Sequence, residues 1–198
     1  MDPGPTNELR MIWETVVTTR SSRGRVHIAP MGIRESKEGR VVLAPFRPST
    51  TLDNVLATRV AAVNFTDDVR VIAGCLTGRP DWPTRACERV DCVRLDGALA
   101  HRELALARID EDSERPRLHC DVVFAANHRP FRGFNRAQAA VVEGAILVSR
   151  LHMLPAEKID TEMKYLAIAI DKTAGPNERE AWSWLVARID AFRAEQAR

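Results

Sequence analysis

The residue types best suited to chemistry gather in the segment RPSTTLDN, just before a short amphipathic helical pattern. The candidate ligands in this segment are Arg47, Ser49, Thr50, Thr51 and Asn54. One interpretation is ordinary capping, with Thr50 as the N-cap and Asp53 at the third helical position. The other is an anion site, because a helix N-terminus offers unpaired N–H groups and a positive dipole end. In that case the guanidinium of Arg47 and the hydroxyls supply further donors for phosphate oxygens.

A second group of polar residues lies in HRPFRGFNR, which spans residues 128–136. Asn135 and Arg136 are either a helix cap and a solvated arginine, or residues that face an anionic ligand. Basic residues interleaved with aromatic ones can also bind nucleic acid. Because the chain has a net charge of only +2 and no nucleic-acid motif accompanies the run, an anionic substrate or cofactor is the favoured ligand and no nucleic-acid partner is expected.

The cysteines and histidines give little sign of metal or hydrolytic chemistry. A zinc site could be built from Cys87, Cys92, His119 and Cys120, but these spacings fit no common zinc module. We therefore predict partly buried structural cysteines and no metal. The chain also lacks GxSxG, HExxH and P-loop motifs, which argues against the common hydrolase and nucleotide-binding classes.

Length and composition limit the kind of domain that can contain these sites. A chain of 198 residues with 45% hydrophobic residues can bury the core of one large domain or of two smaller parts. Basic and acidic residues nearly balance, so no membrane or nucleic-acid partner is indicated. No apolar run approaches the roughly 20 residues needed to cross a bilayer. The N-terminus resembles a loose leader rather than a signal peptide, which predicts a cytoplasmic protein.

The first half of the sequence favours strands. Residues 12–19, 26–36 and 40–46 are predicted to form an antiparallel meander, followed by a helix over 50–59 and an apolar strand over 60–65. Residues 66–97 are not assigned, and part of this stretch suits either a short helix or a strand. Residues 98–110 alternate like a strand, although a helix satisfies much of the same pattern. Residues 117–127 complete a second hairpin.

The spacing of the apolar residues changes after residue 130. Apolar residues recur every three or four positions, which predicts helices over 135–154, 155–173 and 177–198. Asn135 is the expected cap of the first helix and Pro155 lies in the first turn of the second. Asn177, with Glu180 three residues later, is the expected capping box of the third. The predicted organisation is an α+β protein with a β-rich domain at 1–130 and a helical subdomain at 131–198.

In its order of motifs the chain resembles the FMN-binding split barrels, the fold shared by flavin reductases and pyridoxamine-phosphate oxidases. It is most similar to an uncharacterised family of such proteins from methanogenic archaea and some bacteria. The resemblance covers residues 12–190 and rests on five segments: WETVVTTRSSRGRVHIAPMGI, PFRPSTTLDNV, AAVNFTDDV, GFNRAQAAVVEGAILVSRL and YLAIAIDKTAGPNEREAW.

The resemblance implies a six-stranded antiparallel barrel that pairs as a homodimer, with FMN between subunits. It implies that the flavin phosphate lies at the hydroxyl-rich segment. It also implies that the ring lies against Ala29, Pro30, Met31 and Gly32, where a small or donor-free backbone lets a flat group come close. Asn64 ends the apolar strand where related proteins often touch the flavin, although an ordinary strand-end asparagine remains the alternative.

The resemblance also sets the expected function. Flavin chemistry needs little acid–base machinery from the protein, so the expected activity is that of an FMN-dependent oxidoreductase whose catalytic residues and substrate are open. Relatives occur in organisms that use tetrahydromethanopterin, which suggests a reductive step of one-carbon metabolism linked to that pterin. The alternative is a flavin-binding carrier, sensor or scaffold without turnover of its own.

Overall fold

The computed structural model describes residues 11–197, which divide into two compact units. The first unit comprises residues up to 66 together with 83–129, and the second comprises 67–82 and the residues from 130 onward. The leader predicted for residues 1–10 lies outside the described residues. The chain passes from the first unit to the second near residue 130. Residues 67–82 also belong to the second unit, although they lie between β4 and β5 in the sequence.

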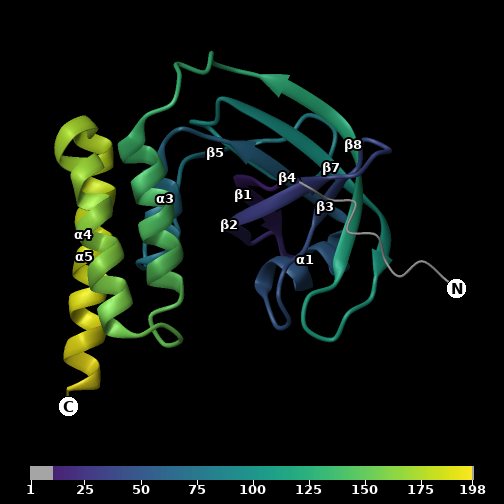
Figure 1. Cartoon of the computed structure of the whole chain (residues 1–198). Helices are drawn as coiled ribbons and strands as arrows, with labels where there is room; N and C mark the ends of the chain where they lie inside the picture. Colours follow the sequence, from purple (N-terminus) through teal and green to yellow (C-terminus); the bar gives the residue numbers. More distant parts are fainter. Residues whose placement is uncertain (1–10, 198) are drawn as a thin grey trace, which may run out of the picture. The chain divides into compact units, whose positions relative to one another are not determined.

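The first unit is a closed antiparallel barrel of six strands in the order β1-β2-β3-β8-β7-β4, drawn in purple to green in Figure 1. The barrel strands are β1 (Trp13–Arg20), β2 (Val26–Glu35), β3 (Val41–Leu43), β4 (Val60–Phe65), β7 (Ala100–Asp110) and β8 (Arg117–Asn127). Helix α1 (Thr50–Thr58) joins β3 to β4, and a hairpin of β5 (Thr84–Ala86) and β6 (Val93–Leu95) precedes β7. The predicted α+β class and antiparallel split barrel are confirmed.

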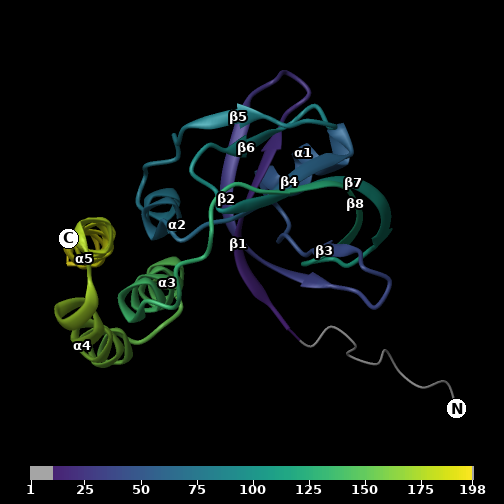
Figure 2. The ribbon, with the colours of Figure 1, turned by 90° about the horizontal axis from the view of Figure 1, so that it is seen from above.

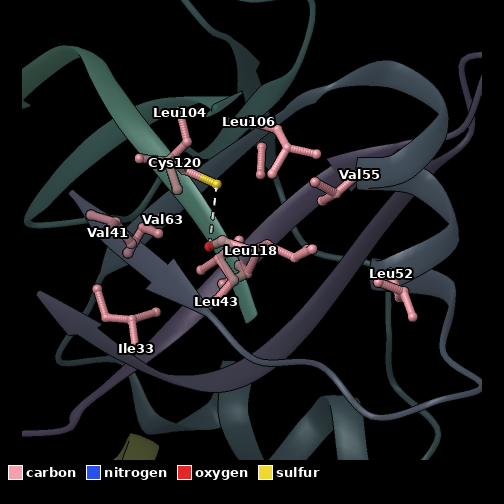
Figure 3. Packing of buried hydrophobic residues seen from close by; sticks show 12 residues of the cluster. Ile33, Val41, Leu43, Leu52, Val55, Val63, Leu104, Leu106, Leu118 and Cys120 are labelled. Atoms are coloured by element: carbon pink, nitrogen blue, oxygen red, sulfur yellow. Dashed lines mark hydrogen bonds between the residues drawn. The ribbon is translucent and has the colours of Figure 1, made fainter. Parts of the chain in front are cut away.

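The barrel closes because alternate side chains of its strands point to one interior. Figure 3 shows this cluster, in which residues of every barrel strand meet Leu52 and Val55 of α1. Each of those two helix residues is at most 1% exposed. Helix α1 is therefore held in place by its apolar face, and this contact fixes the position of its N-terminus.

One of the strand predictions needed correction, and another is confirmed. The strand expected over 40–46 is only Val41–Leu43, because Pro45 cannot donate to a ladder and the chain turns toward α1. Residues 100–110 form a strand, not the alternative helix, and its register shifts after Glu103 and again after Leu106. These irregularities explain why its alternation was hard to read.

The unassigned stretch contains three short elements. Residues Val69–Leu76 form helix α2, which belongs to the helical unit, and residues 84–95 form the hairpin of the barrel unit. Asp68 caps α2 by accepting a hydrogen bond from the N–H of Arg70 (3.1 Å). Nothing in the sequence indicates that residues 67–82 leave the barrel and return.

The second unit packs α2 against three C-terminal helices. These are α3 (Arg136–Ser149), α4 (Ala156–Thr173) and α5 (Pro176–Gln196). Helix α3 contacts α2, α4 and α5, and Figures 1 and 2 show α3, α4 and α5 running side by side. No helix among the described residues is both long and apolar enough to cross a membrane.

The helix caps only partly follow the sequence predictions. Asn135 caps α3, as expected, by accepting from the N–H of Ala137 (2.8 Å). Pro155 precedes α4 instead of lying in its first turn. The box predicted from Asn177 is wrong by two residues, because Gly175 is the N-cap of α5 and donates its N–H to the carboxylate of Glu178 (3.0 Å).

Candidate functional site

The start of α1 presents a mixed set of hydroxyls. The N-cap is Ser49, not Thr50, because the Ser49 Oγ accepts the N–H of Leu52 (3.3 Å). The capping box predicted from Thr50 and Asp53 is therefore wrong. Thr50 is exposed, whereas Thr51 is only 2% exposed and faces the interior. An anion that met this helix end would find the Thr50 hydroxyl and the first unpaired N–H groups of the helix.

Arg47 lies beside this helix end but is paired with an acidic loop. Its Nη2 donates to the carboxylate of Glu111 (2.9 Å) and its Nε contacts the carbonyl of Asp112 (3.4 Å). The side chains of Arg47 and Glu111 are 38% and 70% exposed. Exposed pairs of this kind contribute about 0–1 kcal/mol, so the pairing with Glu111 would oppose an incoming phosphate only weakly.

The stretch Ala29–Gly32 lies in the middle of β2 and is half-buried. It pairs with β1, and β2 meets β3 only at Arg34 and Glu35. Within the described chain, the other edge of the stretch therefore has no strand partner. A Cβ on Gly32 would lie 2.7 Å from Cγ2 of Ile12. The absence of a side chain at Gly32 thus already accommodates Ile12, which is half-exposed and would have to turn aside for a flat ligand.

Two of the predicted ligands are buried amides with partners in the barrel. Asn54 donates from Nδ2 to Oγ1 of Thr19 (2.9 Å), which ties α1 to β1. Asn64 is fully buried, and its Nδ2 donates to the carbonyl of Val16 (3.0 Å). Its Oδ1 accepts the N–H of Leu95 (2.7 Å). Both side chains hold elements of the barrel together, and neither reaches its surface.

The predicted site residues are divided between the two units. Helix α1 contacts β1 and β2, so the Arg47–Thr51 segment and the Ala29–Gly32 stretch belong to neighbouring elements of one unit. Asn135 and the exposed Arg136 lie at the start of α3 in the other unit. There Asn135 acts as a cap and also donates from Nδ2 to the carbonyl of Thr173 (3.1 Å).

Sequence reasoning missed a buried polar cluster at β7. Glu103 is fully buried, and its carboxylate accepts the N–H groups of Glu88 (2.6 Å) and Arg89 (2.7 Å). Burial alone would raise the pKa of Glu103, but these N–H donors and His101 outweigh it and hold the pKa below its usual value. The i, i+2 spacing of His101 and Glu103 on a strand was the available signal.

An open pocket of about 390 Å³ lies at the adjoining ends of β4, β7 and β8. Its lining includes Phe65, His101, Arg102 and Asn127. The guanidinium of Arg102 lies 5.4 Å from the centre of the Phe65 ring and pairs with the carboxylate of Glu35 (2.5 Å). The pocket is therefore partly aromatic and carries one paired cation.

The fold and the arrangement around α1 define the class first: a six-stranded barrel of the flavin-reductase-like split-barrel type with C-terminal helices. Two family models then match the sequence. The N-terminal domain of a protein of unknown function, DUF447, matches residues 13–129, and the C-terminal DUF447 model matches 135–187. The chain belongs to the DUF447 family.

Several solved structures are similar. The crystal structure of the FMN-bound DUF447 protein MM1853 from Methanosarcina mazei aligns with a TM-score of 0.79 at 19% identity, covering 91% of this chain and 97% of that one. The 2-nitrobenzoate 2-nitroreductase NbaA of Pseudomonas fluorescens gives 0.52 at 20% identity, covering 63% and 68%. An FMN-binding protein from Thermus thermophilus gives 0.52 at 16%, covering 64% and 77%. No curated protein matches the sequence.

Proposed function

We propose that this protein binds FMN at the barrel and serves as an FMN-dependent oxidoreductase. The observation that carries the proposal is the agreement of fold with the FMN-bound DUF447 protein over 91% of the chain. The donor set at the start of α1 fits the phosphate of that cofactor, and the free edge of β2 fits a flat ring. Other split barrels of the same fold include a nitroreductase and an NADH:FAD oxidoreductase.

In this proposal the chain's own residues bind and orient the cofactor. The exposed Thr50 and the first N–H groups of α1 hold the phosphate, and Arg47 leaves Glu111 to join them. The backbone of Ala29–Gly32 lies against the ring after Ile12 turns aside. Asn54 and Asn64 act as supports that keep α1 and β4 in place. Bound FMN supplies hydride or electron transfer.

We also propose that the barrel pairs with a second copy of this chain. Large apolar side chains stand exposed on its strands and just before β1: Ile12 (50%), Trp13 (48%), Val26 (38%) and Val123 (45%). Trp13 pairs with Ile33, beside Gly32 of the proposed ring site, and Ile12 precedes it, whereas Val26 lies at the other end of the β1–β2 pair. A self-complementary contact there would cover both the apolar side chains and one face of the flavin.

Sedimentation of the purified protein tests the pairing. We expect a dimer at micromolar concentration and a shift toward monomer in Trp13→Arg, with Phe134→Arg as a control at a fully exposed aromatic in the other unit. A monomer at every concentration would contradict the pairing.

The phosphate site is tested by the double substitution of Arg47 and Thr50 to alanine. We expect FMN affinity to fall by about 10–100-fold, because one charge-assisted contact and one neutral hydrogen bond are lost. Arg40→Ala is the matched control, since Arg40 is another barrel arginine paired with surface carboxylates. If the double variant bound FMN as tightly as wild type does, the segment would be an ordinary helix cap with no role in phosphate binding.

Turnover separates the enzyme from the alternative of a flavin-binding carrier, sensor or scaffold. Steady oxidation of NADH or NADPH by the FMN-loaded protein with an acceptor present would support the enzyme. Tight FMN binding without such turnover, across a panel of donors and acceptors, would favour the alternative. The link to tetrahydromethanopterin stays a prediction from resemblance.

A further inference from the structure

The buried cluster at β7 contains three side chains of metal-ligand type. Cys87 comes from the turn after β5, while His101 and Glu103 come from one face of β7. The Sγ of Cys87, a ring nitrogen of His101 and a carboxylate oxygen of Glu103 all lie within 4.8 Å of one another. His101 is 1% exposed and Glu103 is fully buried, so two of the three donors face the interior and not bulk water.

We propose that Cys87, His101 and Glu103 form a zinc site that fastens the β5–β6 hairpin to barrel strand β7. This site is separate from the proposed FMN site and does not depend on it.

The spacing of the donor atoms suits a tetrahedral ion. Zinc binds nitrogen and oxygen at about 2.0–2.2 Å and sulfur at about 2.3 Å, which places neighbouring ligands roughly 3.3–3.8 Å apart. Nε2 of His101 lies 3.2 Å from Oε1 of Glu103, so this pair already has nearly the required separation. Moving the Cys87 thiol by a rotamer change or a small loop shift would complete three ligands, and water would take the fourth position.

The ligands also have the outer partners that metal sites need. A metal-bound histidine usually donates its other ring N–H to a fixed acceptor, and Nδ1 of His101 lies 2.9 Å from Nε2 of His128. The other carboxylate oxygen of Glu103 accepts the N–H groups of Arg89 (2.7 Å) and Val90 (3.1 Å). These contacts hold both donor groups in orientation. Oε1 of Glu103 also accepts the N–H of Glu88 (2.6 Å), and its second lone pair would serve the ion.

Charge and ligand type favour zinc over other common ions. A thiolate and a carboxylate carry two negative charges, which one Zn²⁺ neutralises in a buried place where an uncompensated charge is costly. One sulfur, one nitrogen and one oxygen donor suit a borderline-soft ion, whereas Mg²⁺ and Ca²⁺ prefer oxygen ligands alone. The set also differs from the one considered from sequence, because His119 and Cys120 lie on β8 and are not among these ligands.

The test is metal binding by the full chain under reducing conditions. Chelator-treated protein is titrated with Zn²⁺ against a chromophoric competitor, and with Co²⁺ followed by absorption. We expect one ion per chain, a sulfur-to-cobalt charge-transfer band, and intense d–d bands typical of four-coordination. Bound Zn²⁺ should also raise the melting temperature.

Variants decide whether the named residues hold the ion. Cys87→Ser should abolish the charge-transfer band, while Cys75→Ser, another half-buried free thiol in the other unit, should bind as wild type does. His128→Ala keeps all three ligands and should weaken binding by about 10–100-fold. Circular dichroism checks that each variant is folded. No saturable binding by wild type, or equal binding by Cys87→Ser, would overturn the site.

Discussion

Asn64 shows how one buried amide can decide where a hairpin lies. Asn64 lies near the end of β4, donates a hydrogen bond to the carbonyl of Val16 in β1, and accepts the N–H of Leu95 in the β5–β6 hairpin. The residue type and the family resemblance suggested a flavin contact, and full burial with protein partners favours the alternative of a structural asparagine. Burial, which a sequence does not display, separates the two roles.

Replacing Asn64 with alanine should destabilise the barrel by about 2–4 kcal/mol, because buried groups such as the N–H of Leu95 would lose their partner without access to water. Urea unfolding followed by circular dichroism measures the change, and hydrogen exchange should locate it at β1, β4 and β6. Asn127→Ala, at an exposed asparagine of β8, is the control. Equal losses in both variants would refute the role given to Asn64.

Asp110 provides a pH-dependent contribution to stability. Desolvation would raise the pKa of Asp110, but the hydrogen bond with Nε2 of His119 (2.7 Å) and nearby arginines outweigh it and lower the pKa. The stabilisation is therefore present above the unfolded-state pKa of about 3.9 and is lost as the pH falls through the lower folded-state value.

We expect Asp110→Asn to be less stable than wild type at pH 6, by at most about 1 kcal/mol because the pair is partly exposed. The difference should shrink as the pH falls below about 4 and on through the lower folded-state pKa, and unfolding free energies in a series from pH 6 down to pH 3 measure it. A difference that persists unchanged at pH 3 would show that the carboxylate charge is not the cause.

At the scale of elements, the close approach of neighbouring atoms to Gly74 limits which side chains helix α2 can accept at that position. A Cβ on Gly74 would lie 2.7 Å from Cζ2 of Trp82 and 3.2 Å from the carbonyl of Arg79. Gly144 of α3 is less restricted, because its nearest atoms are side-chain tips of Trp182 and Leu185 at 3.1 and 3.2 Å. Alanine favours a helix interior over glycine by about 1 kcal/mol, so the outcome depends on which neighbours can move.

Gly74→Ala should destabilise the helical unit by about 1–2 kcal/mol, because overpacking against a ring and a carbonyl exceeds the helical gain. Gly144→Ala should be close to neutral. Chemical unfolding monitored by tryptophan fluorescence compares the two. If Gly74→Ala were as stable as Gly144→Ala, the Trp82 ring would have to be free to move away.

The sequence predicted the elements whose pattern is set locally. The apolar strand 60–65 and the strand 117–127 have the observed bounds, since β-branched and apolar residues fill them. Helix α2 was ambiguous because its eight residues are too few to separate the periods of a helix and a strand. The α1 helix was found, but its cap was misplaced by one residue because Ser49 and Thr50 are both good caps.

The polar clusters could not be predicted in the same way. Glu103 meets the N–H groups of Glu88 and Arg89 only after the chain folds back from the hairpin, and no local pattern encodes that return. The phosphate site was proposed from residue types together with the family resemblance, and the structure adds that Arg47 is paired with Glu111 and that Thr51 is buried.

At the scale of the whole molecule, the chain combines a split barrel with a helical unit that also takes in residues 67–82. The two DUF447 models match residues 13–129 and 135–187, one on each side of the boundary near residue 130. The helical unit contains Arg136 on its surface, and the barrel contains the proposed phosphate and ring sites. The proposed FMN function therefore rests on barrel residues.

A fluorescence titration of flavin-free protein with FMN, run beside riboflavin, tests this function most directly. FMN should saturate at one molecule per chain. Riboflavin, which lacks the phosphate, should bind at least about 10-fold more weakly, since every 1.4 kcal/mol lost is tenfold in affinity. Absence of saturable FMN binding would contradict the proposed function. Equal affinity for the two flavins would show that the start of α1 does not bind the phosphate.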